Sequence, residues 1–143
     1  MDYEDETGLR KSQLEIESLI AEQISLGIPA NKIVIAGFSQ GGVMALQTGL
    51  RYSEKLAGLM CLSGYLPLKE KITTEYHKEN CFTPIFQGHG KSDLVVSIDH
   101  AKKSRDLLKK LGYQIEWHEY TMAHTICIEE IDNIRNWLYR VLF

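Results

Sequence analysis

Three polar side chains attract attention because each follows a segment whose pattern is typical of a strand: Ser39, Asp93 and His124. The carboxyl ends of parallel strands meet at one edge of a sheet, so we expect the three to lie close together. Serine, aspartate and histidine, in that order along a chain, are the nucleophile, the orienting acid and the base of hydrolases built on a nucleophile elbow. The sequence therefore predicts a Ser39–Asp93–His124 catalytic triad.

The segment Gly37-Phe38-Ser39-Gln40-Gly41 has the form of a nucleophile elbow, a sharp turn between a strand and a helix. Glycine on both sides of the serine avoids Cβ clashes in such a turn, so we expect the Ser39 hydroxyl to be exposed at the end of the strand. The N–H of Gln40, at the start of the following helix, is then placed to stabilise an oxyanion. The alternative is that Ser39 only caps that helix.

In the catalytic interpretation, His124 takes the proton of Ser39, and Asp93 holds the imidazole in the required tautomer. His118 is an alternative base, but it falls within an alternating strand, where packing or surface exposure is the simpler explanation. Asp99 is an alternative acid, but it falls in the first turn of a helix, where a carboxylate is favourable in any case. We therefore expect His124 and Asp93 to fill these roles.

The composition is that of an ordinary globular protein and fits one domain, 1–143. The chain has 143 residues, 44% of them hydrophobic and 24% charged, with a net charge of −3. This charge gives no reason to expect a nucleic-acid partner. No apolar run approaches the roughly 20 residues that a membrane span needs. We expect no stable membrane span.

Cysteine spacing bears on the cellular compartment and on metal binding. Cys61, Cys81 and Cys127 are odd in number and widely spaced, which favours reduced thiols in a cytoplasmic protein over a disulfide framework. No pair has the C-x-x-C spacing of a zinc site. His89 and Asp93 share a loop and could both bind a metal, but two such groups alone do not make a metal site. His89 is also a candidate for lining the active site. The sequence predicts no metal and no cofactor.

The elements that must position these residues predict an α/β fold with a mainly parallel sheet of about four strands flanked by helices. Apolar and alternating runs predict strands at 32–37, 56–63, 84–88 and 113–120. Helical spacing predicts helices at 8–26, from the elbow to 52, between Ser97 and Gly112, and at 126–142. The same spacing places Leu19, Leu111 and Ile131 on buried helix faces. Residues 69–80 are polar and predict a loop or a short helical turn.

Three motifs together resemble the carboxylesterase/acyl-protein thioesterase family, the phospholipase/carboxylesterase group of α/β-hydrolases. They are Gly37-Phe38-Ser39-Gln40-Gly41-Gly42, Gly88-His89-Gly90-x-x-Asp93-x-Val95-Val96 and Tyr120-x-Met122-Ala123-His124-x-x-x-x-Glu129-Glu130-Ile131. The similarity covers nearly the whole chain. It implies that Ser39, Asp93 and His124 are the triad and that Gln40 supplies an oxyanion-hole N–H. Ala123 and Thr125 replace the glycine and serine that usually flank the histidine, and both are small.

The resemblance implies hydrolysis of carboxylic esters or thioesters through an acyl-Ser39 intermediate. We expect the apolar residues Leu66, Leu94 and Val95 to line an acyl groove. The family has a further N-terminal portion, with its own strands and a second oxyanion-hole N–H, that this sequence does not contain. We therefore expect the C-terminal part of an α/β-hydrolase fold.

Truncation has two expected consequences. The apolar strand 32–37 has no earlier strand to pair with, and such an edge favours self-association. Loss of one oxyanion donor costs roughly 10²–10³ in kcat, whereas loss of the sheet that positions the elbow abolishes catalysis. The alternative function is therefore a catalytically incompetent hydrolase that acts as a binding or interaction module.

Overall fold

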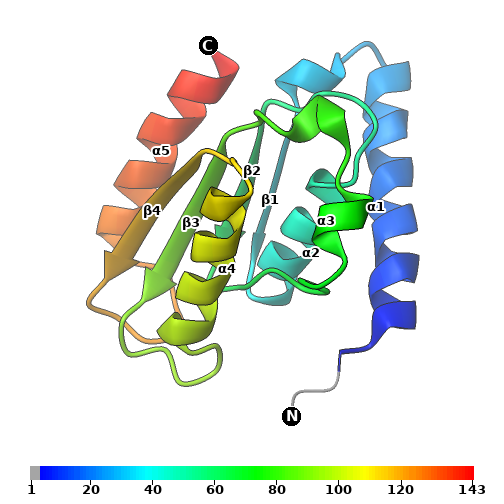
Figure 1. The fold of residues 1–143 in the computed structure, drawn as a ribbon. Coiled ribbons are helices and arrows are strands. Elements are labelled where there is room, and N and C mark those ends of the chain that lie inside the picture. Colours follow the sequence, from blue (N-terminus) through cyan, green and yellow to red (C-terminus); the bar gives the residue numbers. More distant parts are fainter. Residues whose placement is uncertain (1–3) are drawn as a thin grey trace.

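The computed structural model describes residues 4–143 and confirms an α/β fold with a parallel sheet (Figure 1). The four strands lie in the order β1-β2-β3-β4 and all neighbours are parallel. Their bounds are β1 Val34–Phe38, β2 Gly58–Leu62, β3 Ile85–Gly90 and β4 Ile115–Tyr120. The α-helices are α1 Glu6–Ser25, α2 Gln40–Gly49, α3 Ile72–Glu75, α4 Ile98–Lys110 and α5 Ile128–Leu142, with short 3₁₀ turns at 30–32 and 78–80.

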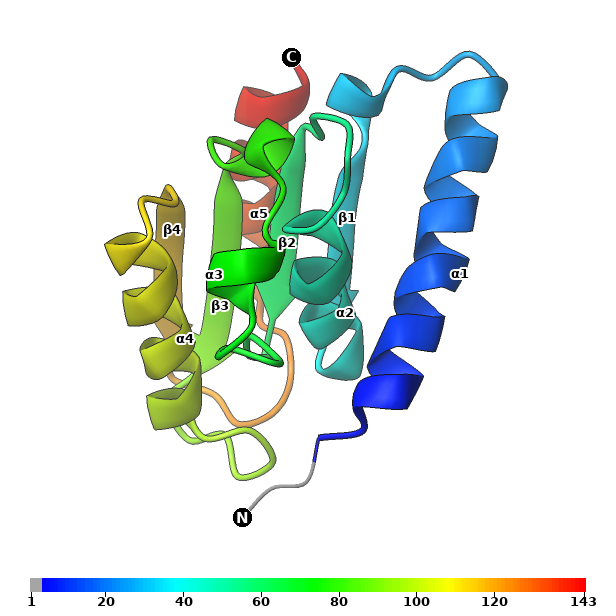
Figure 2. The ribbon, with the colours of Figure 1, turned by 45° about the vertical axis from the view of Figure 1, so that its right-hand side comes forward.

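The sheet separates two layers of helices (Figures 1 and 2). On one face, α2 packs against β1 and β2, α4 packs against β3 and β4, and α1 packs on α2 from outside. The core on this face includes Leu46, Leu50, Leu59, Ile85 and Leu108. On the other face, α5 covers a smaller core of Met60, Leu62, Phe86 and Trp137. All six residues of β3 are buried, as expected for a strand between two layers.

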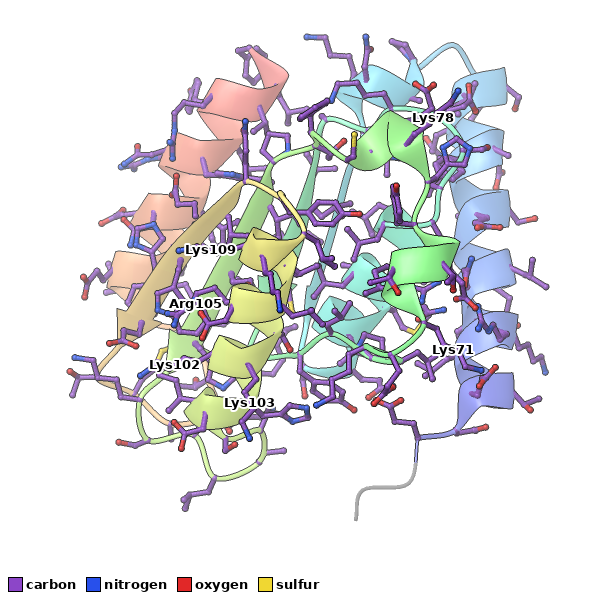
Figure 3. The ribbon with its side chains drawn as sticks, in the orientation of Figure 1. Lys71, Lys78, Lys102, Lys103, Arg105 and Lys109 are labelled. Atoms are coloured by element: carbon purple, nitrogen blue, oxygen red, sulfur yellow. The ribbon has the colours of Figure 1, made fainter. Side chains whose placement is uncertain are left out.

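Helix α4 illustrates how the sequence divides into a buried face and an exposed face. Ala101, Ser104 and Leu108 face the sheet and are buried. Figure 3 labels four basic side chains of the same helix, Lys102, Lys103, Arg105 and Lys109. Two of them lie beside β4, where Lys102 pairs with Glu119 and Arg105 stacks over Trp117. The Ser97 side chain caps the helix by accepting a hydrogen bond from the N–H of His100. The start of α4, directly after the loop that carries Asp93, is thus fixed locally.

The predicted strands and helices are confirmed, with shifts at several ends. The first strand begins at Val34 because residues 30–32 form a 3₁₀ turn, closed by the N–H of Lys32 on the carbonyl of Pro29. Helix α2 ends at Gly49, three residues before the predicted end. Asp5 caps α1, and Gly27 follows that helix with a φ of 103°, which glycine adopts without strain.

Three apolar side chains expected to be buried are exposed: Leu19, Leu111 and Ile131. Helix α1 packs mainly on α2, so only the narrow stripe through Leu9 and Ile20 is buried. Leu111 is the C-cap of α4, beyond its last packed turn. The buried residues of α5 are Glu130 and Trp137, seven positions apart on one line, and Ile131 lies off that line. Apolar periodicity alone does not show how much of a helix's surface is buried against its neighbours.

The strand that leads to Ser39 forms one edge of the described sheet. Ala36 and Phe38 of β1 are exposed there, and self-association through this edge stays a prediction. Within residues 4–143, no helix is both long and apolar enough to cross a membrane.

The carboxylate of Glu75 links helix α1 to the other helices on the same face of the sheet. Arg10 of α1 donates two hydrogen bonds to Glu75 of α3, with N–O distances of 2.8 and 2.7 Å. Arg51, just after α2, donates a third through Nε at 2.8 Å. The hydrogen bonds from Arg10 outweigh the opposing effect of burial and, with the one from Arg51, lower the pKa of Glu75 to about 2. Glu75 therefore links α1, α2 and α3.

We expect Glu75→Gln to lower the free energy of unfolding by about 1–3 kcal/mol at neutral pH, because it leaves the buried Arg51 guanidinium without its charged partner. The folded-state pKa lies below the ordinary value of 4.5, so this contribution is complete above pH 4.5 and is lost as the pH falls toward 2. Urea titrations of parent and variant should therefore converge across this window. Glu70→Gln, at an exposed position nearby, is the control. A difference that stays constant with pH would contradict the assignment.

Candidate active site

The elbow around Ser39 has a strained backbone conformation and close contacts between backbone segments. Ser39 lies between β1 and α2 with φ 57° and ψ −116°, a conformation that costs a residue with a side chain about 1–3 kcal/mol. The N–H of Ser39 donates to the carbonyl of Leu62 in the neighbouring strand at 2.7 Å. A Cβ on Gly37 would lie 2.1 Å from the carbonyl carbon of Gly41, so only glycine fits there. The sheet thus holds the serine in a conformation that the chain would not adopt by itself.

The Ser39 hydroxyl points toward His124 and does not cap the helix that follows. Ser39 occupies the N-cap position of α2 but makes no side-chain capping hydrogen bond. Its Oγ lies 2.9 Å from Nε2 of His124. The helix-capping interpretation of this serine is therefore wrong.

The loop that carries His124 is fastened to the end of β3. Lys91 and Ser92 donate backbone hydrogen bonds to the carbonyls of Tyr120 and Met122, at 2.8 and 3.0 Å. A Cβ on Gly90 would lie 2.2 Å from the carbonyl oxygen of Ala123, so the absence of a side chain lets the two segments touch. This contact helps to fix the position of the His124 loop relative to the carboxyl end of β3.

Asp93 is buried and receives hydrogen bonds at both carboxylate oxygens. Its Oδ2 lies 2.6 Å from Nδ1 of His124. Its Oδ1 accepts from the backbone N–H groups of Val95 and Val96, both at 2.8 Å. Burial alone would raise the pKa of Asp93, but the hydrogen bonds from His124, Val96 and Val95 outweigh it and lower that pKa. The side chain is therefore a carboxylate at neutral pH.

This arrangement determines where the imidazole proton lies. A carboxylate only accepts hydrogen bonds, so Nδ1 of His124 must donate to Asp93, and in the neutral ring Nε2 then presents its lone pair to Ser39. The Phe38 ring, 4.9 Å away between centroids, packs against the imidazole. The three side chains can therefore move a proton from Ser39 Oγ to His124 without rearrangement.

The rival residues lie in other settings. His118, on β4, is 2.8 Å from Glu116 through Nε2 and stacks on Phe86. Asp99 is exposed in the first turn of α4. Within residues 4–143, no group of three or more His, Cys, Asp or Glu side chains is placed to hold a metal ion.

The three predicted acyl-contact residues are not all at the surface. Leu94 and Val95 follow Asp93 directly and are 97% and 70% exposed. Leu66 is only 1% exposed, belongs to the main core, and has its N–H bonded to Ser104 Oγ at 2.9 Å. A fully buried side chain cannot line an open groove, so the assignment of Leu66 needs correction. Its position after a strand was the only sequence signal, and that signal did not distinguish surface from core.

A cavity of about 380 Å³ beside the elbow was not expected from the sequence. Its lining residues are Glu4, Asp5, Gly8, Leu9, Ser12, Gln40, Met44 and Tyr65. Gln40 directly follows Ser39, so the cavity adjoins the candidate nucleophile. The start of α1 and the start of α2 are distant in sequence, and no local pattern shows that they meet.

Comparison with known proteins identifies relatives over nearly the whole chain. The model of the family described as phospholipase/carboxylesterase matches residues 1–142. An acyl-protein thioesterase 1 of Yarrowia lipolytica is 42% identical over 138 residues, which are 94% of this chain and 61% of that protein. A Neurospora crassa protein of the same name is 45% identical over 141 residues, 94% of this chain and 56% of its own length. The chain thus spans about three fifths of the curated relatives that it matches.

Solved structures agree with this comparison. The crystal structure of Arabidopsis thaliana SOBER1 matches 99% of this chain and 68% of its own, with a TM-score of 0.94 and 29% identity. The crystal structure of Zea mays acyl-protein thioesterase 2 matches all of this chain and 71% of its own, with a TM-score of 0.84 and 26% identity. The described strands and helices therefore have the same arrangement as the corresponding parts of these proteins.

Proposed function

Since the chain belongs to the phospholipase/carboxylesterase family, we propose that it is a serine hydrolase that cleaves carboxylic esters or thioesters of acyl chains through an acyl-Ser39 intermediate. The observation that carries this proposal is the pair of hydrogen bonds that joins Asp93 to His124 and His124 to Ser39. A serine becomes an effective nucleophile when an oriented base accepts its proton.

The reaction proceeds in two halves. Ser39 Oγ attacks the acyl carbonyl carbon while its proton passes to Nε2 of His124, and the carbonyl oxygen becomes an oxyanion. His124 then returns the proton to the leaving alcohol or thiol, which departs and leaves the acyl group on Ser39. Water attacks this ester, gives a proton to His124, and the acid is released as the proton returns to Ser39 Oγ.

Gln40 contributes to oxyanion stabilisation through its backbone. It is the first residue of α2, and the first four N–H groups of a helix have no partner within the helix. The positive end of the helix dipole lies at the same point. These features support Gln40 N–H as an oxyanion-hole donor adjacent to the attacking oxygen.

The names of the relatives support an acyl thioester as the substrate class. Leu94 and Val95, exposed beside Asp93, give an apolar surface for the acyl chain. The chemistry above needs neither metal nor cofactor. The three cysteines are free thiols, which supports a reducing compartment such as the cytoplasm.

Turnover of a thioester and an ester with the same acyl chain tests this function. We expect the parent protein to release thiol and alcohol from the two substrates, and Ser39→Ala to release neither above the rate in buffer. A folded parent protein that turns over neither substrate would exclude the hydrolase function and favour an interaction module that only keeps the triad residues.

We expect Leu94→Asp to weaken hydrolysis of long acyl chains more than that of short ones. Each buried CH₂ contributes about 0.8 kcal/mol to binding. A carboxylate at this exposed position removes the apolar contact, and the acyl chain could cover it only by taking the charge out of water. The measurement is kcat/KM for a series of p-nitrophenyl esters of increasing length. Leu26→Asp, an exposed leucine at the far end of α1, is the matched control. Equal losses for all chain lengths would count against an acyl-contacting role of Leu94.

A further inference from the structure

His89 is a buried histidine that the reaction described above does not use. It is the fifth residue of β3 and is 1% exposed. Its Nε2 lies 2.8 Å from the carbonyl oxygen of Val96 and 3.5 Å from Oδ2 of Asp93. A carbonyl oxygen only accepts hydrogen bonds, so Nε2 of His89 carries the proton and donates to Val96.

This hydrogen bond connects His89 to the segment that holds Asp93, the proposed acid of the triad. Val96 is held through its carbonyl by His89, and its own N–H donates to Oδ1 of Asp93 at 2.8 Å. The N–H of Val95 donates to the same oxygen. The segment 93–96 is otherwise an exposed turn between β3 and α4, with Leu94 and Val95 in solvent. The N–H of Asp93 donates to the carbonyl of Gly90 at the start of the turn, at 3.3 Å, and His89 is the side chain of β3 that fastens its far end at Val96.

From this geometry we propose that His89 is a positioning residue of the active site, which fixes the segment 93–96 so that Asp93 meets His124 at hydrogen-bond distance. The proposal rests on the hydrolase function proposed above. His89 acts through Asp93 and Val96 and does not touch the substrate.

The 2.6 Å contact between Asp93 and His124 explains why anchoring matters. Short, charge-assisted hydrogen bonds depend steeply on distance and angle. A displacement of about 1 Å in a catalytic group can cost roughly 10²-fold in rate. If segment 93–96 moves, His124 loses the partner that sets its tautomer, and Ser39 loses its base.

The test compares two replacements of similar length that differ in one hydrogen-bond donor. Glutamine places an N–H₂ near the position of the imidazole Nε2, whereas methionine fills the space without a donor. Measured on a short acyl ester, whose chain is too short to depend on Leu94 and Val95, we expect His89→Met to lower kcat by roughly 10- to 100-fold with a much smaller change in KM. His89→Gln should recover most of that loss. Near-ultraviolet circular dichroism checks that each variant is folded. If methionine prevents folding, His89→Asn, whose amide is too short to reach Val96, replaces it.

A second measurement does not need catalysis. In a Ser39→Ala background, the proton shared by His124 Nδ1 and Asp93 should give a far-downfield NMR resonance. We expect it to persist in His89→Gln and to broaden or move upfield in His89→Met. If the parent shows no hydrolysis but the resonance responds in this way, the hydrolase function fails and the positioning role stands. Equal kcat values and unchanged resonances in both folded variants would overturn the positioning role while leaving the hydrolase function intact.

Discussion

Replacing His124 with alanine is expected to lower kcat for acyl-ester hydrolysis by about 10⁴-fold or more, with the fold intact. The imidazole is the only group within hydrogen-bond distance of Ser39 Oγ that the described residues provide as a base. Without it, the hydroxyl keeps its proton and attacks the carbonyl poorly. The measurement is the steady-state rate on a soluble p-nitrophenyl ester, with thermal unfolding to confirm folding. His124→Ala removes one hydrogen bond from the buried Asp93 carboxylate, which keeps those from the Val95 and Val96 N–H groups, so we expect the free energy of unfolding to fall by only about 1–2 kcal/mol.

His118→Ala is the matched control for this variant. His118 is partly buried and is hydrogen bonded to a carboxylate, as His124 is, but its partner Glu116 lies on the same strand. We expect this variant to keep kcat close to that of the parent. Equal losses at both positions would show that the assay reports general damage to β4 and its loop, and would contradict His124 as the base.

Gly37→Ala is expected to disrupt the elbow and remove activity as fully as loss of the serine does. The new Cβ would lie 2.1 Å from the Gly41 carbonyl carbon and 2.2 Å from its oxygen, both backbone atoms that cannot rotate away. Either α2 moves from the sheet or the turn opens, and each change displaces Ser39 relative to His124. We expect the free energy of unfolding to fall by about 2–4 kcal/mol, which is typical of overpacking at a rigid contact. Urea denaturation gives the stability, and ester turnover gives the activity.

Gly41→Ala separates this steric effect from glycine's general flexibility. A Cβ at Gly41 would meet no atom within 4 Å, and the position lies in the first turn of α2. Alanine is favoured over glycine in a helix by up to about 1 kcal/mol, so this variant should be as stable as the parent or more so. If the two variants lose similar stability, the close approach of Gly37 to Gly41 is not what shapes the elbow.

Local patterns predicted the fold and the proximity of Ser39, Asp93 and His124 because the relevant signals are short-range. A β-branched run before Gly37-x-Ser39-x-Gly41 predicts a strand, a turn and a helix from neighbouring residues alone. Asp93 and His124 were identified because each follows a strand, and parallel strands bring their carboxyl ends to one edge. The contacts of 2.6 and 2.9 Å among them then result from the sheet register.

Features that depend on tertiary packing were not predictable in this way. Leu66 and Leu94 are both leucines near strand ends, yet one is in the core and the other is 97% exposed. The sequence suggested His89 as a residue lining the site or as a metal ligand, and not as an anchor of the turn, because its hydrogen bond to Val96 depends on how the turn folds back. The link from Glu75 to Arg10 joins residues 65 positions apart, and nothing near either one indicates its partner.

The measurement that tests the central claim most directly is the intact mass of the protein after treatment with a fluorophosphonate probe, with Ser39→Ala alongside. Such probes modify a serine that a neighbouring base activates. The account predicts one adduct on the parent protein and none on Ser39→Ala, with both proteins folded. A folded parent that remains unmodified would contradict the claim that Ser39, His124 and Asp93 form a working triad in this chain.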